Sequence, residues 1–294
     1  QAGTRLMIDA SGSDYIDPDV LSLIRDYKNN TAPARDVKVN LVGFRSKYQL
    51  RDDVQFADYT TRELQDKATA DQVITILREG NRRFVEGTRL NRDLGRQVNA
   101  TAIGQNPLAA VLSCIDSRVP TELVFDLGVG DIFSVRVAGN IVGTKSLGSL
   151  EYAVGVAGVK LVVVLGHTRC GAVTSSVKLV AGKQDAMKAT GCEHLQAIVD
   201  EIAPSIQGLP DSLDELSEEG LDTYVDNVAK SNVIHTAEEI IRRSQVIRNA
   251  VNEGRAKVIG ALYDVKTGKT EFFGAPPTGP SDEPAHKSFA DSPH

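Results

Sequence analysis

The chain has 294 residues, of which 41% are hydrophobic and 24% charged, and its formal net charge at pH 7 is −6. These proportions are typical of a globular protein, and no apolar run approaches the roughly 18 to 20 residues that a membrane-spanning helix requires. An acidic chain without a long lysine and arginine cluster is not expected to bind nucleic acid through charge.

The N-terminus shows no targeting segment. The chain begins with Gln1 and has no leader that runs from charged to apolar residues. We therefore predict no signal peptide and expect an excised piece of a longer protein. The three cysteines, Cys114, Cys170 and Cys192, are too few for a disulfide-stapled secreted domain and favour a reducing compartment.

The first 44 residues predict a single β-α-β unit. Residues 6–8 form a short apolar run that predicts a strand, and Asp17 followed by a proline is typical of a helix N-terminus. Apolar and polar residues alternate over residues 37–41, which predicts a half-buried second strand. A unit of this size buries too little apolar surface to fold strongly alone. The polar residues 45–68 are predicted to form a linker.

Residues 69–274 predict an α/β domain built on a mostly parallel β-sheet flanked by helices. Near-continuous apolar runs over residues 107–113 and 158–166 are typical of strands buried on both faces. Strands alternate with helices along the chain, which favours a parallel sheet. The other predicted elements are a helix capped by Thr69, helices at 147–156, 192–203 and 225–252, and strands at 132–137, 258–263 and 270–273. Residues 275–294, rich in Pro, Ser, Gly and charge, predict a disordered tail.

Two short segments beyond predicted strands carry the reactive side chains. Cys114-Ile115-Asp116-Ser117-Arg118 follows one buried strand, and His167-Thr168-Arg169-Cys170 follows another. In open α/β sheets, sites form beyond the carboxyl ends of the strands, so we expect Cys114, His167 and Cys170 to converge. Two thiolates and one imidazole suit Zn²⁺, and three protein ligands leave a fourth position for water, as in catalytic zinc sites.

The first segment also contains a carboxylate and a guanidinium two residues apart. In an extended segment Asp116 and Arg118 point to the same side, so we predict a bidentate ion pair. Beside zinc, such a carboxylate can accept a hydrogen bond from metal-bound hydroxide and stay off the metal. The alternatives are buried structural cysteines, a redox pair of Cys114 and Cys170, and a surface ion pair. A redox pair leaves His167 without a role.

These segments and several others resemble the β-class carbonic anhydrases over residues 69–274. The resemblance rests on Cys-x-Asp-Ser-Arg followed by His-x-x-Cys-Gly at the separation typical of that family. Supporting segments lie at residues 80–84, 130–140, 149–154, 232–233 and 263–268. The resemblance implies zinc held by Cys114, His167 and Cys170, with Asp116 and Arg118 as the catalytic dyad. It also implies reversible hydration of CO₂ to bicarbonate and a proton.

Three further residues point to the plant-like kind of this family. That kind lines its substrate pocket with a glutamine, a phenylalanine and a tyrosine, and this sequence has Gln105, Phe133 and Tyr152 at those positions. The other kind uses a tryptophan in an allosteric bicarbonate site, and this chain has no Trp. The resemblance thus implies an open zinc site, with Gln105 donating to a substrate oxygen and Phe133 excluding water. It also implies a homodimer or higher oligomer, because the family places these residues across a subunit interface.

Two glycines bear on the shape of the expected pocket. Gly171 is counted among the substrate-binding residues, because a glycine there allows close backbone approach, begins the next helix and turns its amide toward the metal thiolate. The family usually reads Arg-Asn-x-Ala-Asn where this chain has Val137 and Gly139 in place of the first Asn and the Ala. These two departures are expected to alter the pocket and to leave the metal site intact.

Residues 6–12, 17–19 and 31–44 resemble the later part of a STAS domain, the cytoplasmic tail of SulP-type anion transporters. This resemblance implies that the chain is the cytosolic end of a membrane transporter fused to a carbonic anhydrase. The enzyme would then lie in the cytoplasm, at the inner face of the membrane. A generic N-terminal extension is the alternative.

Two other functions stay open on the residues alone. One is a zinc-stabilised regulatory tail of a transporter that no longer hydrates CO₂, which the intact Asp116 and Arg118 pair disfavours. The other is a thiol redox or Cys-His nucleophilic enzyme, which would bind no stoichiometric zinc. The remaining Cys192, His194 and His235 are expected to be bystanders on the surface or on helix faces.

Overall fold

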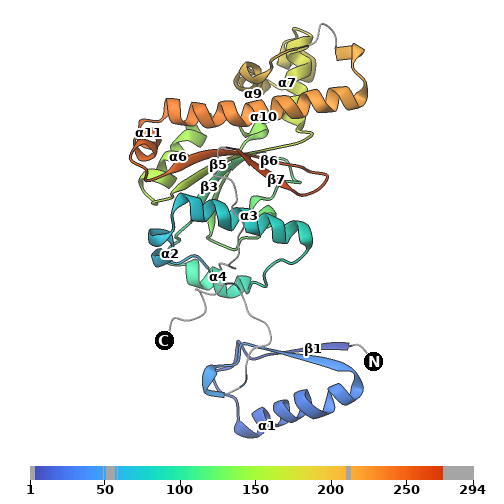
Figure 1. Cartoon of the computed structure of the whole chain (residues 1–294), viewed down its shortest axis with the longest axis vertical. Helices are drawn as coiled ribbons and strands as arrows, with labels where there is room; N and C mark the ends of the chain where they lie inside the picture. Colours follow the sequence, from blue (N-terminus) through green and yellow to red (C-terminus); the bar gives the residue numbers. More distant parts are fainter. Residues whose placement is uncertain (1–3, 49, 51–56, 58, 210–212, 274–294) are drawn as a thin grey trace. The chain divides into compact units, whose positions relative to one another are not determined.

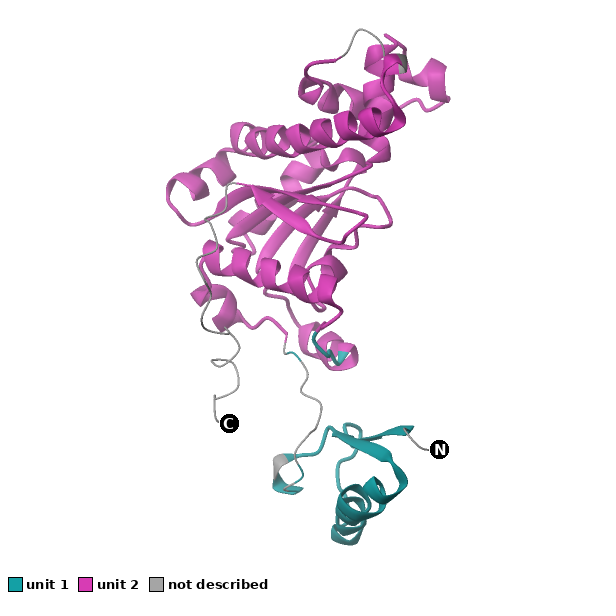
Figure 2. Cartoon of the chain, turned by 45° about the vertical axis from the view of Figure 1, so that its right-hand side comes forward, with its two compact units in different colours: residues 1–58, 90–93 teal, residues 59–89, 94–294 magenta. Residues whose placement is uncertain are grey.

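The computed structural model describes residues 4–48, 50, 57, 59–209 and 213–273. They form two compact units (Figure 2). One contains the described part of the first 58 residues with Leu90–Asp93, and the other contains Tyr59–Arg89 and the described residues from Leu94 onward. No helix in these described ranges is long and apolar enough to cross a membrane.

The division between the units falls inside residues 45–68, which the sequence predicts to be a linker. Tyr48 belongs to the core of the first unit, and the second unit begins at Tyr59. The segment also contains a helix, α2 (Arg62–Lys67), that the sequence pattern did not predict. The tail predicted over residues 275–294 lies outside the described residues.

The first unit is a β-α-β fragment, as predicted. Its elements are β1 (Thr4–Asp9), α1 (Pro18–Asp26), the short helical turns η1 (Tyr27–Thr31) and η2 (Pro33–Arg35), β2 (Val37–Val42), and η3 (Ser46–Tyr48). The two strands pair in parallel, and the Asp17 carboxylate accepts from the N–H of Asp19 to cap α1. Leu41 is fully buried, whereas Met7 and Leu23 are 59% and 71% exposed. The unit therefore leaves much of its apolar surface uncovered.

The second unit is built on a five-stranded sheet (Figure 1). Its strands are β3 (Ala109–Ser113), β4 (Ile132–Arg136), β5 (Leu161–His167), β6 (Lys257–Tyr263) and β7 (Thr270–Phe273). They lie in the order β4-β3-β5-β6-β7, and only β7 is antiparallel to its neighbour. The strands β3 and β5 are buried along their whole length, as their continuous apolar runs predict. The prediction of an α/β fold with a mostly parallel sheet is confirmed.

Helices cover both faces of this sheet (Figure 1). The helices of this unit are α2, α3 (Ala70–Glu86), α4 (Leu94–Thr101), α5 (Thr121–Val124), α6 (Thr144–Gly155), α7 (Gly171–Ala181), α8 (Ala186–Thr190), α9 (Leu195–Ile202), α10 (Glu218–Arg243) and α11 (Gln245–Asn252), with short turns η4 (Ala138–Asn140), η5 (Ala203–Ser205) and η6 (Leu213–Glu215). Of these, α3 packs on one face of the sheet and α6, α10 and α11 on the other. Alternate strand residues face opposite ways, so Val163 packs with residues of α3 while Val164 packs with residues of α6, α10 and α11. The predicted cap Thr69 begins α3 through a reciprocal capping box with Gln72.

The long helix predicted over residues 225–252 is in fact two helices. It begins earlier, at Glu218, and α10 ends just before the fully buried Ser244. The backbone of Ser244 is extended, and its hydroxyl accepts from the N–H of Ile247 at 3.1 Å and donates to Glu151 at 2.7 Å. Serine at this position therefore caps α11 instead of continuing α10, because its hydroxyl competes with the helical backbone for hydrogen bonds.

Candidate metal centre and active site

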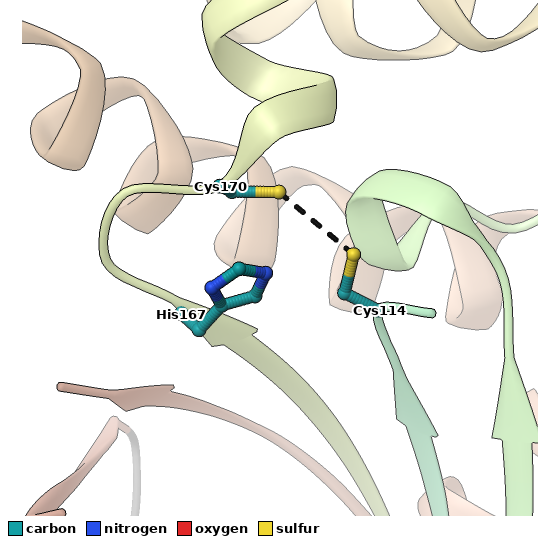
Figure 3. Close-up of side chains that lie close together, drawn as sticks. All are labelled: Cys114, His167 and Cys170. Atoms are coloured by element: carbon teal, nitrogen blue, oxygen red, sulfur yellow. Dashed lines mark hydrogen bonds between the residues drawn. The ribbon is translucent and has the colours of Figure 1, made fainter. Parts of the chain in front are cut away.

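Cys114 directly follows β3, and His167 is the last residue of the neighbouring strand β5 (Figure 3). The strands β3 and β5 pair in parallel with Ser113 opposite Leu165, so both chains leave the sheet at the same edge. Cys170 is the N-cap residue of α7, shortly after β5 ends. The predicted convergence of the three side chains is confirmed, because their ligand atoms all lie within 4.8 Å of one another.

Burial and hydrogen bonding of these side chains fit a metal ion. Cys114, His167 and Cys170 are 3%, 0% and 1% exposed. Nδ1 of His167 donates to the carbonyl of Thr168 at 2.9 Å, which leaves Nε2 as the unprotonated ring nitrogen. Nε2 is buried and has no hydrogen-bond partner among the described residues, which is unfavourable unless something binds it. Two sulfurs and this nitrogen form a donor set that suits Zn²⁺.

A hydrogen bond joins the sulfurs of Cys114 and Cys170. Their Sγ atoms lie 3.9 Å apart, as the dashed line in Figure 3 marks. The hydrogen bond from Cys170 lowers the pKa of Cys114 to about 4, with help from the backbone N–H groups of Asp116 and Gly139. The same hydrogen bond and burial raise the pKa of Cys170. A divalent cation in place of the proton in that hydrogen bond would hold both sulfurs as thiolates.

Asp116 and Arg118 form the bidentate ion pair that their spacing predicts. Nε of Arg118 donates to Oδ1 at 2.9 Å, and Nη2 donates to Oδ2 at 2.8 Å. Hydrogen bonds from this guanidinium above all lower the pKa of Asp116 to about 2, so the carboxylate stays ionised near neutral pH. Its Oδ2 lies 3.9 Å from Nε2 of His167, which places the pair beside the candidate metal centre.

Three residues that were not predicted to belong to the site also support it, although Arg136 and Asn232 lie in segments that carry the family resemblance. Arg136, the last residue of β4, donates through Nε to the carbonyl of Cys114 at 2.9 Å and through Nη2 to the carbonyl of Asp116 at 2.6 Å. Pairing β4 with β3 places its last residue beside the end of β3, so strand alignment would have revealed this role. The other two, Asp226 and Asn232, lie on α10. Asp226 accepts from the N–H of Arg169 in the loop that carries Cys170, and Asn232 donates to the carbonyl of Gly139, whose N–H reaches Sγ of Cys114.

The three predicted pocket residues are not brought to the metal centre within one chain. Phe133 pairs with Ala110, which precedes Cys114 on the neighbouring strand by about 13 Å of extended chain. The rings of Phe133 and Tyr152 meet edge-on, with centroids 6.4 Å apart. Both line a surface cavity of about 550 Å³ that includes neither Gln105 nor any metal ligand. Gln105 lies in an exposed loop after α4.

Gly171 begins α7, as predicted, but its position makes no special demand for glycine. A Cβ at this residue would meet no heavy atom of the chain within 4 Å, so the expected close backbone approach does not occur within the chain. The N–H groups that reach the Cys170 sulfur belong instead to Ala172 and Val173.

Gly139→Ala is expected to destabilise the protein by about 1–3 kcal/mol, because a residue with a side chain is strained in the left-handed region. Gly139 has a φ of 71°, and a Cβ there would lie 2.7 Å from Cδ1 of Ile202. Urea unfolding measures the loss, and Gly171→Ala serves as the control because its new methyl group meets nothing. Equal unfolding midpoints for Gly139→Ala and the parent protein would contradict the strain.

Comparison with known proteins agrees with this site. The family model described as carbonic anhydrase matches residues 109–270, which include both reactive segments. Carbonic anhydrase 2 of Mycobacterium tuberculosis is 36% identical over 195 residues, which are 66% of this chain and 87% of that protein. The carbonic anhydrase of Mycolicibacterium smegmatis is 35% identical over 197 residues, which are 67% of this chain and 89% of that protein.

A solved structure extends the similarity to the fold. The crystal structure of the β-carbonic anhydrase CafA of Aspergillus fumigatus matches with a TM-score of 0.51 and 27% identity. The match covers 63% of this chain and 83% of that one. With the family model spanning more than half of the residues and the Cys-His-Cys set in place, this chain belongs to the β-class carbonic anhydrase family.

Proposed function

We propose that this chain is a zinc enzyme that catalyses the reversible hydration of CO₂ to bicarbonate and a proton. The observation that carries the proposal is the buried set of Cys114, His167 and Cys170 beside the ion pair of Asp116 and Arg118. The three side chains would hold zinc and leave one coordination position open. Zinc bound there supplies Lewis acidity, which lowers the pKa of a water molecule in the open position toward neutrality.

The ion pair orients the attacking water in this mechanism. The Asp116 carboxylate is ionised and only accepts hydrogen bonds, so Oδ2, which lies 3.9 Å from Nε2 of His167, can accept from that water. A water molecule held in this way turns a lone pair toward the carbon of CO₂. Arg118 engages both carboxylate oxygens and so keeps the carboxylate from becoming a further zinc ligand. This open arrangement and the absence of Trp from the sequence support the plant-like subtype.

Zinc content and stopped-flow CO₂ hydration on the same sample test the function. We expect about one zinc per chain and turnover far above the uncatalysed rate. Stoichiometric zinc without turnover would favour a regulatory tail instead, and a sample without zinc would favour a thiol enzyme. Either result would overturn the proposal.

We further propose that a second copy of the chain completes the substrate pocket. Phe133 lies far along the sheet from Cys114, and Tyr152 is 57% exposed, so both are accessible to a partner chain. Apolar side chains elsewhere on the same unit, such as Ile103 at 99% and Val156 at 71%, are also exposed and fit a surface that a homodimer or higher oligomer covers. In that assembly Gln105 would donate to a substrate oxygen and Phe133 would exclude water.

We propose that the first unit is part of a STAS domain and that it attaches the enzyme to a SulP-type anion transporter at the cytoplasmic face of a membrane. The parallel β-α-β arrangement of β1, α1 and β2 supports this assignment. The exposed apolar side chains of Met7 and Leu23 fit a unit that packs against further elements of a larger domain.

Removal of residues 1–58 is expected to leave zinc content and CO₂ hydration nearly unchanged. The removed segment contains no metal ligand and neither residue of the ion pair, and the cores around the sheet contain none of its residues. The measurement is kcat/KM and metal content of residues 59–294 beside the full chain. An insoluble or inactive product would show that the segment belongs to the enzyme's own fold, and the two-module proposal would fail.

A further inference from the structure

The helix α10 passes close to the loop that carries Cys170 and to the turn η4, whose Gly139 contacts the Cys114 sulfur. It packs against β5, β6, α7 and the turn η4, and Figure 1 shows it crossing one face of the sheet. Its apolar residues Val225, Val228 and Ala229 share a core cluster with Cys114 and Cys170. Two of its polar side chains, Asn232 and Asp226, form hydrogen bonds with backbone groups of η4 and of the Cys170 loop.

Asn232 holds the turn η4 beside Cys114. Its side chain is fully buried, and Nδ2 donates to the carbonyl of Gly139 at 2.8 Å. The N–H of Gly139 in turn donates to Sγ of Cys114 at 3.4 Å. Glycine rotates freely about its backbone bonds, so a bond to its carbonyl restrains the direction of its N–H.

The buried amide of Asn232 is costly for the fold. Its Oδ1 has no hydrogen-bond partner in the described part of the chain, so only half of the amide is satisfied. An apolar side chain of similar size would avoid that desolvation cost. Packing alone therefore does not explain an amide at this position. The hydrogen bond from Asn232 to the carbonyl of Gly139 does, because an apolar side chain could not form it.

Asp226 holds the loop on the Cys170 side. Its Oδ1 accepts from the backbone N–H of Arg169 at 2.7 Å. Arg169 lies between His167 and Cys170 and has a φ of 54°, a left-handed conformation that its surroundings must hold in place. The carbonyl of Arg169 accepts from Nη2 of Arg118 at 3.2 Å, so the same peptide segment is linked to the ion pair.

We propose that Asn232 and Asp226 are positioning residues of the metal centre, through which α10 sets the placement of both cysteine sulfurs. The inference rests on the proposed zinc function. Both residues belong to one helix, so a single rigid element positions the turn η4 and the loop that carries Cys170. Groups of this kind around a metal site typically change metal affinity by about 10- to 100-fold when they are removed.

Asp226 offers the sharper test, because its substitution does not disturb a core. Asp226→Ala removes the acceptor and is expected to lower zinc affinity at least about 10-fold, measured by competition with a chromophoric chelator. Asp226→Asn keeps an acceptor oxygen and is expected to stay within about twofold of the parent protein. Asp222→Ala is the matched control, because it removes an ion pair with the Arg169 side chain at 3.1 Å and leaves the backbone bond intact. We expect no change in zinc affinity for this control.

Asn232→Leu tests the contact between α10 and the turn η4. We expect weaker zinc binding and a changed absorption spectrum of the cobalt-substituted protein, because the direction of the Gly139 N–H at the Cys114 sulfur is no longer restrained. Ile240→Val, a fully buried position further along α10, controls for a general loss of core packing. Its cobalt spectrum should match that of the parent protein.

Three results decide the inference. If the parent protein binds zinc while Asp226→Ala binds it equally tightly, the positioning role is wrong and the proposed function survives. If Asp226→Asn loses as much affinity as Asp226→Ala, the charge matters and not the acceptor, which also contradicts the inference. A parent protein without zinc overturns the proposed function and this inference together. Asn232→Leu that does not fold leaves the Asp226 variants to decide.

Discussion

Cys170→Ser is expected to abolish stoichiometric zinc binding and to reduce CO₂ hydration to the background rate. The substitution leaves two ligands, Cys114 and His167, and a neutral hydroxyl does not replace a thiolate as a ligand for this ion. The free energy of zinc binding adds to the free energy of folding, so the variant should also lose stability locally. Cys170 is only 1% exposed and belongs to a core cluster that includes residues of α10. We therefore expect the packing of this cluster to lose stability.

The matched control for this variant is Cys192→Ser. Cys192 is an exposed free cysteine, so its replacement changes the same atom without touching the site. Metal analysis after dialysis, together with stopped-flow hydration, compares the two proteins. One zinc per chain with normal turnover in Cys170→Ser would show that the ligand assignment is wrong.

Asp116→Asn is expected to retain zinc and to lose CO₂ hydration by on the order of 10²-fold or more. The side chain keeps its size, but its amide nitrogen can no longer accept a hydrogen bond from the attacking water, and it repels the Arg118 donors. Zinc should remain because none of Cys114, His167 and Cys170 is altered. A variant with zinc and unchanged kcat would remove Asp116 from the mechanism.

The same carboxylate makes a prediction about pH. The pKa of Asp116 in the folded chain is lowered to about 2, chiefly by hydrogen bonds from Arg118. A carboxylate with a lowered pKa contributes stability above its unfolded pKa of about 3.9 and loses that contribution as the pH falls toward the folded value. Asp116 is therefore ionised throughout the neutral range. A step near pH 7 in the pH–rate profile would then come from the water at the open zinc position and not from Asp116. We expect Asp116→Asn to keep the midpoint of that step and to have a lower rate at every pH. A step that disappears in the variant would contradict this assignment.

Features that depend on residues close together in the chain were the most predictable. The pairing of Asp116 with Arg118 depends on an interval of two residues, and the caps at Asp17 and Thr69 depend on contacts within one helical turn. The meeting of Cys114 with His167 was also predictable, although 53 residues separate them. Cys114 follows one buried strand and His167 ends the neighbouring parallel strand, and parallel strands end at the same edge of a sheet.

Other features depend on how the elements pack, and the sequence pattern did not reveal them. The break at Ser244 lies inside a continuous helical pattern and follows from a hydrogen bond to Glu151 on another helix. The distance of Phe133 from the metal centre follows from the register of β4 on β3, which hydrophobic pattern alone leaves open.

By itself, the sequence determined the α/β class, the Cys-His-Cys set and the ion pair. Continuous apolar runs indicate buried parallel strands, and the interval of two residues between Asp116 and Arg118 indicates their pairing. Only the tertiary structure decided which groups hold that set in place. Asp226 and Asn232 meet their partners across 57 and 93 positions of the chain. Such contacts require α10 to pack on the sheet at one particular rotation, and the helical period of the sequence defines a buried face without defining what that face meets.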